Sequence, residues 1–147
     1  MILVIFNKER NGLISAFAEF GQALINLKEK IMNKKSIVNK NSGIYFRSES
    51  NGWGLKDEFA QRKNGTYVLK HVKINKGANE FKIADANWSA ECNYGFDGDM
   101  PIMLYHNYAL NNGSNTNIRM IAHNDYFVDI FLYKTDGGLT MRVVSNK

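Results

Sequence analysis

Both tryptophans of the chain, Trp53 and Trp88, stand in stretches rich in asparagine and glycine. An indole in such a loop offers a flat apolar face that can stack on the C–H face of a sugar ring. Nearby lysine, asparagine and aspartate side chains can bond the sugar hydroxyls. Lys82 lies between the tryptophans in the sequence, and the alternation of Phe81-Lys82-Ile83 predicts that it faces outward. Each indole could instead cap the open end of a β-sandwich core, and Lys82 alone could be a solvated surface residue, but the combination favours a shallow sugar-binding surface.

Other residues that could carry chemistry are isolated. His71, His106 and His123 fall on separate predicted strands without the close spacing of metal ligands. Cys92 is the single cysteine, which excludes a disulfide or a cysteine-built zinc site within one chain, and no histidine stands near it to activate the thiol. The Asp-Gly-Asp run at 97–99 lacks the rest of a calcium loop and predicts a turn. The sequence therefore predicts no catalytic residue, no metal and no cofactor, as in a protein that is not an enzyme.

The basic charge is an N-terminal feature. The net charge is +5, and residues 1–42 hold seven basic against three acidic residues. The excess concentrates around 28–40, where cations suit the last turn of a helix and a solvated linker. A nucleic-acid interface would need these bases spread over a face and interleaved with aromatic residues. We therefore predict no nucleic-acid partner.

Targeting signals are weak. No apolar run approaches the roughly 18 to 20 residues of a membrane span, so the sequence predicts no membrane partner. The apolar Met1–Phe6 is shorter than the roughly 7 to 15 residues of a signal-peptide core, and no basic region precedes it. Together with the unpaired Cys92, this favours a cytoplasmic location.

Apolar residues recur with a helical period in 13–32. They follow a spacing of 4, 3, 4, 3, 4 along one seam: Leu13, Phe17, Phe20, Leu24, Leu27 and Ile31. Three readings stay open: a helix packed on its own domain, a homo-oligomerising helix, or a helix on a membrane surface. We lean toward the homo-oligomer, because six large apolar side chains need a partner surface. The polar stretch 33–42 predicts a linker, which divides the chain into an N-terminal helical segment, 1–42, and a β-sandwich domain, 43–147.

After residue 43 the pattern changes from helical to alternating. Seven segments rich in β-branched and aromatic residues are strand candidates: Ile44–Arg47, Thr66–Ile74, Asn79–Ala84, Ile102–His106, Asn117–His123, Tyr126–Tyr133 and Leu139–Val144. Asn-Gly, Lys-Gly and Asp-Gly-Gly turn signals separate several of them. The predicted fold is mainly β: an antiparallel, immunoglobulin-like β-sandwich with an N-terminal amphipathic helix.

The order of the motifs within 44–95 resembles a known family. An aromatic strand ends in arginine, an Asn-Gly-Trp turn follows, and a Phe-Lys-Ile-Ala strand precedes a second tryptophan: Tyr45-Phe46-Arg47, Asn51-Gly52-Trp53-Gly54, Gly65-Thr66-Tyr67, Phe81-Lys82-Ile83-Ala84-Asp85-Ala86-Asn87-Trp88-Ser89 and Asn93-Tyr94-Gly95. This order is similar to that of the starch- and glycogen-binding modules attached to pullulanases and related amylases. More distantly, it resembles the glycogen-binding modules of AMP-activated kinase and of branching enzymes.

The resemblance implies a β-sandwich that binds α-1,4-glucan (starch, glycogen or malto-oligosaccharide) without catalysis. In those modules two tryptophans and a lysine contact the glucan, which carries over to Trp53, Trp88 and Lys82. A further asparagine contributes in relatives, and Asn93 is its nearest match here.

Three departures keep a second function open. Arg47-Ser48-Glu49-Ser50 stands where relatives often have Arg-Gly-Ser, the insert Gly98–Ser114 is longer than the pattern, and no amylase domain follows in this sequence. The alternative is a protein-interaction scaffold, such as a small inhibitor or adaptor, on the same fold without sugar binding.

Overall fold

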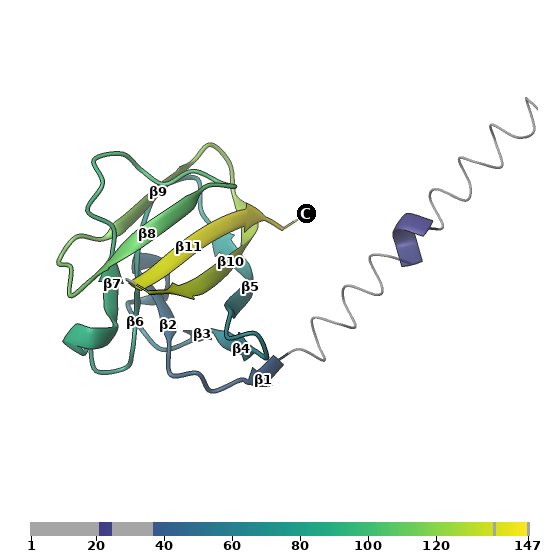
Figure 1. The fold of residues 1–147 in the computed structure, drawn as a ribbon. Helices are drawn as coiled ribbons and strands as arrows, with labels where there is room; N and C mark the ends of the chain where they lie inside the picture. Colours follow the sequence, from purple (N-terminus) through teal and green to yellow (C-terminus); the bar gives the residue numbers. More distant parts are fainter. Residues whose placement is uncertain (1–20, 25–36, 137, 147) are drawn as a thin grey trace, which may run out of the picture. The chain divides into compact units, whose positions relative to one another are not determined.

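The computed structural model describes residues 21–24, 37–136 and 138–146 (Figure 1). The chain forms two compact units, Met1–Ser36 and Ile37–Lys147. In the first unit residues 21–24 are helical, and the rest of the helix predicted over 13–32 lies outside the described residues. The homo-oligomer through this helix therefore stays a prediction. No helix within the described ranges is long and apolar enough to cross a membrane.

The second unit is built almost entirely from strands and short 3-10 turns. In chain order its elements are β1 (Ile37–Asn39), β2 (Tyr45–Ser48), η1 (Glu49–Asn51), β3 (Asp57–Glu58), β4 (Ala60–Arg62), β5 (Tyr67–Ile74), β6 (Gly77–Ala84), η2 (Ala90–Cys92), β7 (Asn93–Gly95), β8 (Asn107–Asn112), β9 (Ile118–Ala122), β10 (Tyr126–Thr135) and β11 (Gly138–Ser145). Every strand pair is antiparallel. The prediction of a mainly β, antiparallel sandwich-like fold is confirmed.

The strands form one curled sheet in two layers (Figure 1). Their order is β1-β4-β5-β10-β11-β8-β7-β6-β2-β3, and β9 pairs with β6 off this path. Strand β8 joins the layers, because Leu110 pairs with β11 while Asn111 and Asn112 pair with β7. Strands β5, β10 and β11 thus pack against β2, β6 and β9.

The core fills the space between these layers. Alternating residues of each strand point into it and are almost fully buried, among them Phe46, Phe81, Ile83, Ile118, Met120, Val128, Ile130, Leu132, Met141 and Val143. One tight connection shows how the turns are made. Gly65 has a φ of 85°, its N–H donates to Arg62 O at 3.0 Å, and Thr66 N–H donates to Asn64 Oδ1 at 3.0 Å. The Asn-Gly signal at 64–65 therefore marks a turn, as predicted.

One strand prediction is wrong. Residues 102–106 form no strand, and β8 begins just after them, at Asn107, within the insert Gly98–Ser114. Tyr105 has a φ of 66°, in the left-handed region that interrupts an extended strand. The polar Asn107–Asn112 pairs instead because β11 and β7 supply backbone partners to it. The other six predicted strands correspond to β2, β5, β6, β9, β10 and β11.

Candidate functional site

The fold brings the two tryptophans together. Trp53 follows η1, and Trp88 lies in the loop between β6 and η2. Their ring centroids are 6.3 Å apart and their planes differ by 52°. Trp53 is half-buried, while Trp88 keeps 37% of its surface exposed. Neither indole belongs to the sandwich core, so the pair forms a tilted aromatic surface at the rim of the fold.

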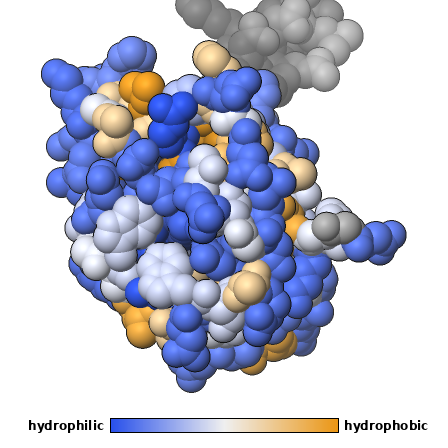
Figure 2. Space-filling view, turned by 90° about the vertical axis from the view of Figure 1, so that its left-hand side faces the viewer, coloured by the Kyte–Doolittle hydropathy of each residue, from blue (hydrophilic) through white to orange (hydrophobic). Residues whose placement is uncertain are grey.

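The view from the left-hand side of Figure 1 is largely hydrophilic (Figure 2). Side chains of intermediate hydropathy gather in its lower part, and hydrophobic ones reach the surface only in small areas. Such a face suits a polar ligand more than a large apolar one.

Both tryptophans are held in a backbone conformation that side chains rarely adopt. Trp53 has a φ of 58° and Trp88 a φ of 54°. A left-handed conformation costs energy for a bulky residue and persists only where the surroundings fix it. Two bulky residues in this state at one surface point to a site whose geometry matters.

The Trp53 turn is fixed by its own backbone and two polar side chains. Ser48 and Asn51 form a reciprocal capping box around η1, with Ser48 N–H donating to Asn51 Oδ1 at 3.0 Å. The Trp53 N–H then donates to Ser48 O at 2.7 Å. Asn51 Nδ2 also donates to Asp57 Oδ2 at 2.9 Å, which ties the turn to β3. The asparagine thus has a structural role in presenting the indole.

The Trp88 loop is fixed by the carboxylate of Asp85. Asp85 Oδ1 accepts the N–H groups of Asn87 at 3.2 Å and Ser89 at 2.8 Å, on either side of Trp88. The hydrogen bond from the Ser89 side chain, together with these backbone bonds and the nearby Arg47, lowers the pKa of Asp85 although burial acts to raise it. The loop is therefore held by an ionised carboxylate.

Arg47 joins the Trp53 turn to the Trp88 loop by bonding backbone carbonyls of both. Its Nε donates to Trp53 O at 2.7 Å, and its Nη1 donates to Asp85 O at 3.0 Å and Ala86 O at 3.1 Å. The guanidinium carbon lies 3.8 Å from the centre of the Trp88 ring, a cation–π contact. Only 8% of Arg47 is exposed, and burial lowers its pKa while the charge of Asp85 opposes the shift. A single planar fork thus fixes both indoles.

Lys82 points away from the core, as predicted, but the expectation that it is exposed to solvent is wrong. It pairs with Arg47 across β6 and β2, on the side away from the core, but only 6% of it is exposed. Its Nζ donates to the carbonyl of Ser114, whose hydroxyl in turn donates to Asp97 Oδ1 at 2.6 Å. Burial lowers the pKa of Lys82, and the charge of Asp97 acts in the opposite direction. The alternation gave the correct face, but residues 113–116 cover that face.

Gly95 allows this cover to come close. A Cβ built at Gly95 would lie 1.9 Å from Thr116 O and 2.9 Å from Ser114 Oγ. No side chain fits there without moving the backbone of residues 114–116. The absence of a side chain at Gly95 is therefore part of how Lys82 is buried.

Asn93, the fourth predicted site residue, lies at the base of the Trp88 loop. It pairs with Ala84 in β6, and the residue before it, Cys92, accepts the N–H of Asp85 at 3.0 Å. Its own carbonyl accepts the N–H of Gly113 at 2.8 Å. Its side-chain oxygen is buried and has no hydrogen-bond partner among the described residues. Asn93 thus begins the strand that follows the Trp88 loop, but its side-chain oxygen is buried and not exposed to a ligand.

The described part of the chain contains no group of three or more histidine, cysteine, aspartate or glutamate side chains that could hold a metal. The residue that sequence reasoning missed is Arg47, which the motif included without a role. Its position four residues before Asn51-Gly52-Trp53 was the available signal, but its partners at 85 and 86 lie in the loop after a different strand, β6.

Comparison with known proteins supports the fold. No protein-family model matches the chain, and no curated protein matches it. Among solved structures, the chain is similar to one described as the ligand-induced structure of AmyP-SBD, a starch-binding domain. The match has a TM-score of 0.59 at 16% identity and covers 76% of this chain and 79% of that one. The likeness to starch-binding modules inferred from the sequence is thus confirmed at the level of the fold.

Proposed function

We propose that the protein binds α-1,4-glucan through the tilted pair of Trp53 and Trp88, without catalysis. The observation that carries the proposal is the pair itself: two indoles at the rim, 6.3 Å apart, both held at positive φ. The surrounding hydrogen bonds hold both residues in this conformation, so the indoles need little ordering when a ligand binds. The starch-binding domain of like fold adds support from outside the chain.

The tilt between the rings favours a curved glucan over a flat one. Successive residues of an α-1,4-linked chain turn relative to one another, so their apolar faces meet platforms at different angles. A β-1,4-linked chain is flat and would need coplanar platforms. The 52° between the planes of Trp53 and Trp88 therefore suits the α-linkage.

Polar groups beside the indoles can bond the sugar hydroxyls. Asn87 is exposed next to Trp88, and its amide offers both a donor and an acceptor. We assign Lys82 and Asn93 a supporting role, because the one holds the 113–116 segment and the other lies under the Trp88 loop. The contact set is then smaller than the predicted one.

The affinity should be weak. A shallow surface removes little water, and a small ligand still loses its translational freedom on binding. We expect a dissociation constant of about 10 µM to 1 mM for a malto-oligosaccharide, or about −7 to −4 kcal/mol.

Tryptophan fluorescence titrated with maltoheptaose tests the proposal, because both tryptophans lie in the site. The wild type should show a saturable change, and Trp53→Ala and Trp88→Ala should each weaken binding, measured by calorimetry, at least tenfold. Tyr133→Ala, which removes an exposed aromatic side chain from β10, is the matched control and should bind like the wild type. Cellohexaose tests the linkage and should bind at least tenfold more weakly. If the fluorescence of the wild type does not change with millimolar maltoheptaose and calorimetry detects no binding, the proposal is refuted.

One observation favours the alternative, a protein-interaction scaffold. The segment before β8 exposes the side chains of Met100 at 74% and Met103 at 62%. Ile121 of β9, exposed at 58%, lines the same surface hollow. Apolar residues grouped at a surface are typical of protein contacts. If maltoheptaose does not bind, Met103→Asp with an unchanged melting temperature is the variant with which to test this surface.

A further inference from the structure

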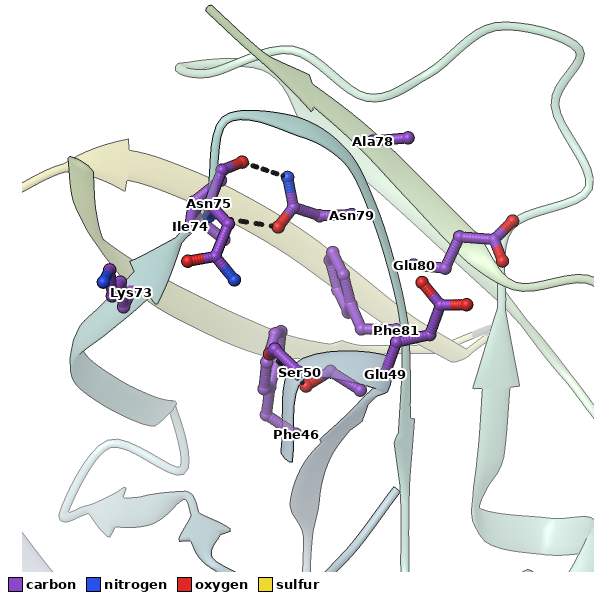
Figure 3. A pocket seen from close by; sticks show the side chains of 11 residues that line it. Phe46, Glu49, Ser50, Lys73, Ile74, Asn75, Ala78, Asn79, Glu80 and Phe81 are labelled. Carbon is purple, nitrogen blue, oxygen red and sulfur yellow. Dashed lines mark hydrogen bonds between the residues drawn. The ribbon is translucent and has the colours of Figure 1, made fainter. Parts of the chain in front are cut away.

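A groove separate from the tryptophan pair runs between η1 and the turn that joins β5 to β6 (Figure 3). It has two lobes, of about 230 and about 500 Å³. Phe46, Ser50, Lys73 and Asn75 line both lobes, so the lobes lie side by side. Ser48, which also lines the smaller lobe, bonds Trp53 on the other side of η1. The groove and the tryptophan pair thus flank the same 3-10 turn.

The smaller lobe combines an aromatic base with polar walls. The rings of Phe46 and Phe81, 4.7 Å apart, lie at its base. Lys73 lies at one end and the carboxylates of Glu49 and Glu80 lie at the other (Figure 3). Donors and acceptors thus surround an apolar patch.

Two asparagines make one wall rigid. Asn79 Nδ2 donates to Asn75 O at 2.8 Å, and Asn79 Oδ1 accepts the N–H of Asn75 at 3.2 Å (Figure 3). Asn79 Nδ2 also donates to Gly77 O at 3.1 Å. The turn between β5 and β6 is therefore fixed by its own amide groups. A ligand would meet a wall that needs no ordering on binding.

The larger lobe contains a stacked aromatic pair. The rings of His71 and Phe127 lie 4.0 Å apart and within 5° of parallel, and both side chains are exposed. His71 has a φ of 60°, at a bulge where β5 shifts its register against β10. The buried Asp129 holds this bulge by accepting the N–H of His71 at 3.0 Å. The strained backbone at His71 thus places a flat aromatic surface in the groove.

The charges of the groove select the class of ligand. Its carboxylates come from Glu49, Asp57 and Glu80 and its ammonium groups from Lys56 and Lys73, so the excess is one negative charge, which is too small to select a strongly charged ligand. Hydroxyl groups can bond both kinds of side chain, and the C–H face of a sugar can lie on the exposed ring pair of His71 and Phe127. This combination suits a neutral pyranose.

We propose that the groove is a second carbohydrate-binding site, which holds one or two pyranose residues of a glucan. The identity of the sugar rests on the proposed function, but the residues are different from those of the tryptophan pair. The groove binds more weakly than the tryptophans, since its aromatic base is buried and offers little area for stacking.

Amide chemical shifts measured during a maltoheptaose titration of the full chain test this site. The N–H groups of Ser50, Lys73 and Asn79 report on the groove, while the fluorescence of the indoles reports on the tryptophan pair. In the Trp88→Ala variant the groove amides should still shift and saturate at millimolar sugar. Ser50→Tyr should weaken the groove response at least tenfold and change the fluorescence titration less than twofold. Ala109→Tyr, an exposed position of β8, is the matched control and should alter neither response.

The outcomes separate the two proposals. Groove amides that do not move, beside a saturable fluorescence change, overturn the second site and leave the proposed function standing. Groove amides that move without any fluorescence change support the groove and refute the tryptophan pair. Groove shifts that vanish in Trp88→Ala overturn the second site, because they then only transmit binding at the indoles.

Discussion

The tryptophan pair and the wall of the groove use the same device with opposite charge. In each region a buried charged side chain holds an aromatic residue at positive φ by bonding the backbone around it. Arg47 donates to the carbonyls of both tryptophan loops, whereas Asp129 accepts the N–H of His71. A buried backbone group without a hydrogen-bond partner would destabilise the fold further than the backbone strain alone. The charged side chain supplies that partner and so stabilises the strained conformation.

The sign of the charge decides how each region responds to its surroundings. A guanidinium stays protonated at any pH at which the protein folds, even where burial lowers its pKa. A carboxylate can be neutralised by acid. The groove wall should therefore be sensitive to acid through Asp129, and the Trp88 loop through Asp85.

Arg47 and the carbonyls to which it donates form what we call the cationic clamp. Breaking this clamp should have the largest effect. Arg47→Met keeps much of the side-chain volume but removes three hydrogen bonds and the contact with Trp88. We expect the free energy of unfolding to fall by about 3 kcal/mol, because several backbone carbonyls lose their partner. Maltoheptaose binding should fall at least tenfold. Denaturant unfolding and calorimetry measure the two effects.

Arg47→Lys is the control for that variant, since it keeps the charge and loses the fork. It should recover part of the stability and little of the binding. A lysine that restores full binding would show that charge alone positions the indoles and that the planar geometry is unimportant.

The anionic clamp is Asp129 with the donors around it. It should contribute less to stability than the cationic clamp. Asp129 accepts bonds from His71 N–H, Asn146 Nδ2 at 2.7 Å and Lys70 Nζ at 3.1 Å. Lys70 is nearly half exposed, so the ion pair itself adds little. Asp129→Ala should lower the free energy of unfolding by about 2 kcal/mol through the unpaired donors. The fluorescence titration should stay within twofold of the wild type; a loss of that binding would show that the two regions are coupled.

These clamps also mark the limit of what the sequence could predict. The sandwich and the loop positions of Trp53 and Trp88 follow from alternation and from Asn and Gly, which act locally. The clamp of Arg47 joins residues 38 apart, and the bond of Lys82 joins residues 32 apart. Alternation indicates a face but not whether a distant loop covers it, which is why Lys82 was expected at the surface. The bulge at His71 was invisible because its cause, Asp129, stands on another strand.

Acid should distinguish the clamps further. Burial acts to raise the pKa of Asp129, but the bonds from His71, Lys70 and Asn146 outweigh it, so the pKa in the folded protein is below the ordinary value. Its contribution to stability is therefore fully present above about pH 3.9 and is lost as the pH falls through the lower folded value. The difference in unfolding free energy between the wild type and Asp129→Asn should shrink over that window. The Asp85 contribution is common to both proteins and cancels. A difference that grows in acid would contradict the assignment.

The smallest effect on binding should come from Lys82, the lysine that the family resemblance places in contact with glucan. Lys82→Met keeps the length of the side chain, removes its bond to Ser114, and also removes the cost of burying an ammonium group. These terms oppose each other, so we expect the free energy of unfolding to change by about 1 kcal/mol and the affinity for maltoheptaose to stay within twofold. Lys76→Met, at an exposed lysine of the turn between β5 and β6, is the matched control and should leave both quantities unchanged. A tenfold loss of affinity in Lys82→Met at unchanged stability would mean that the 113–116 segment opens when sugar binds. In that case the lysine would reach the ligand directly, and the covered face in the free protein would be a closed form of the site.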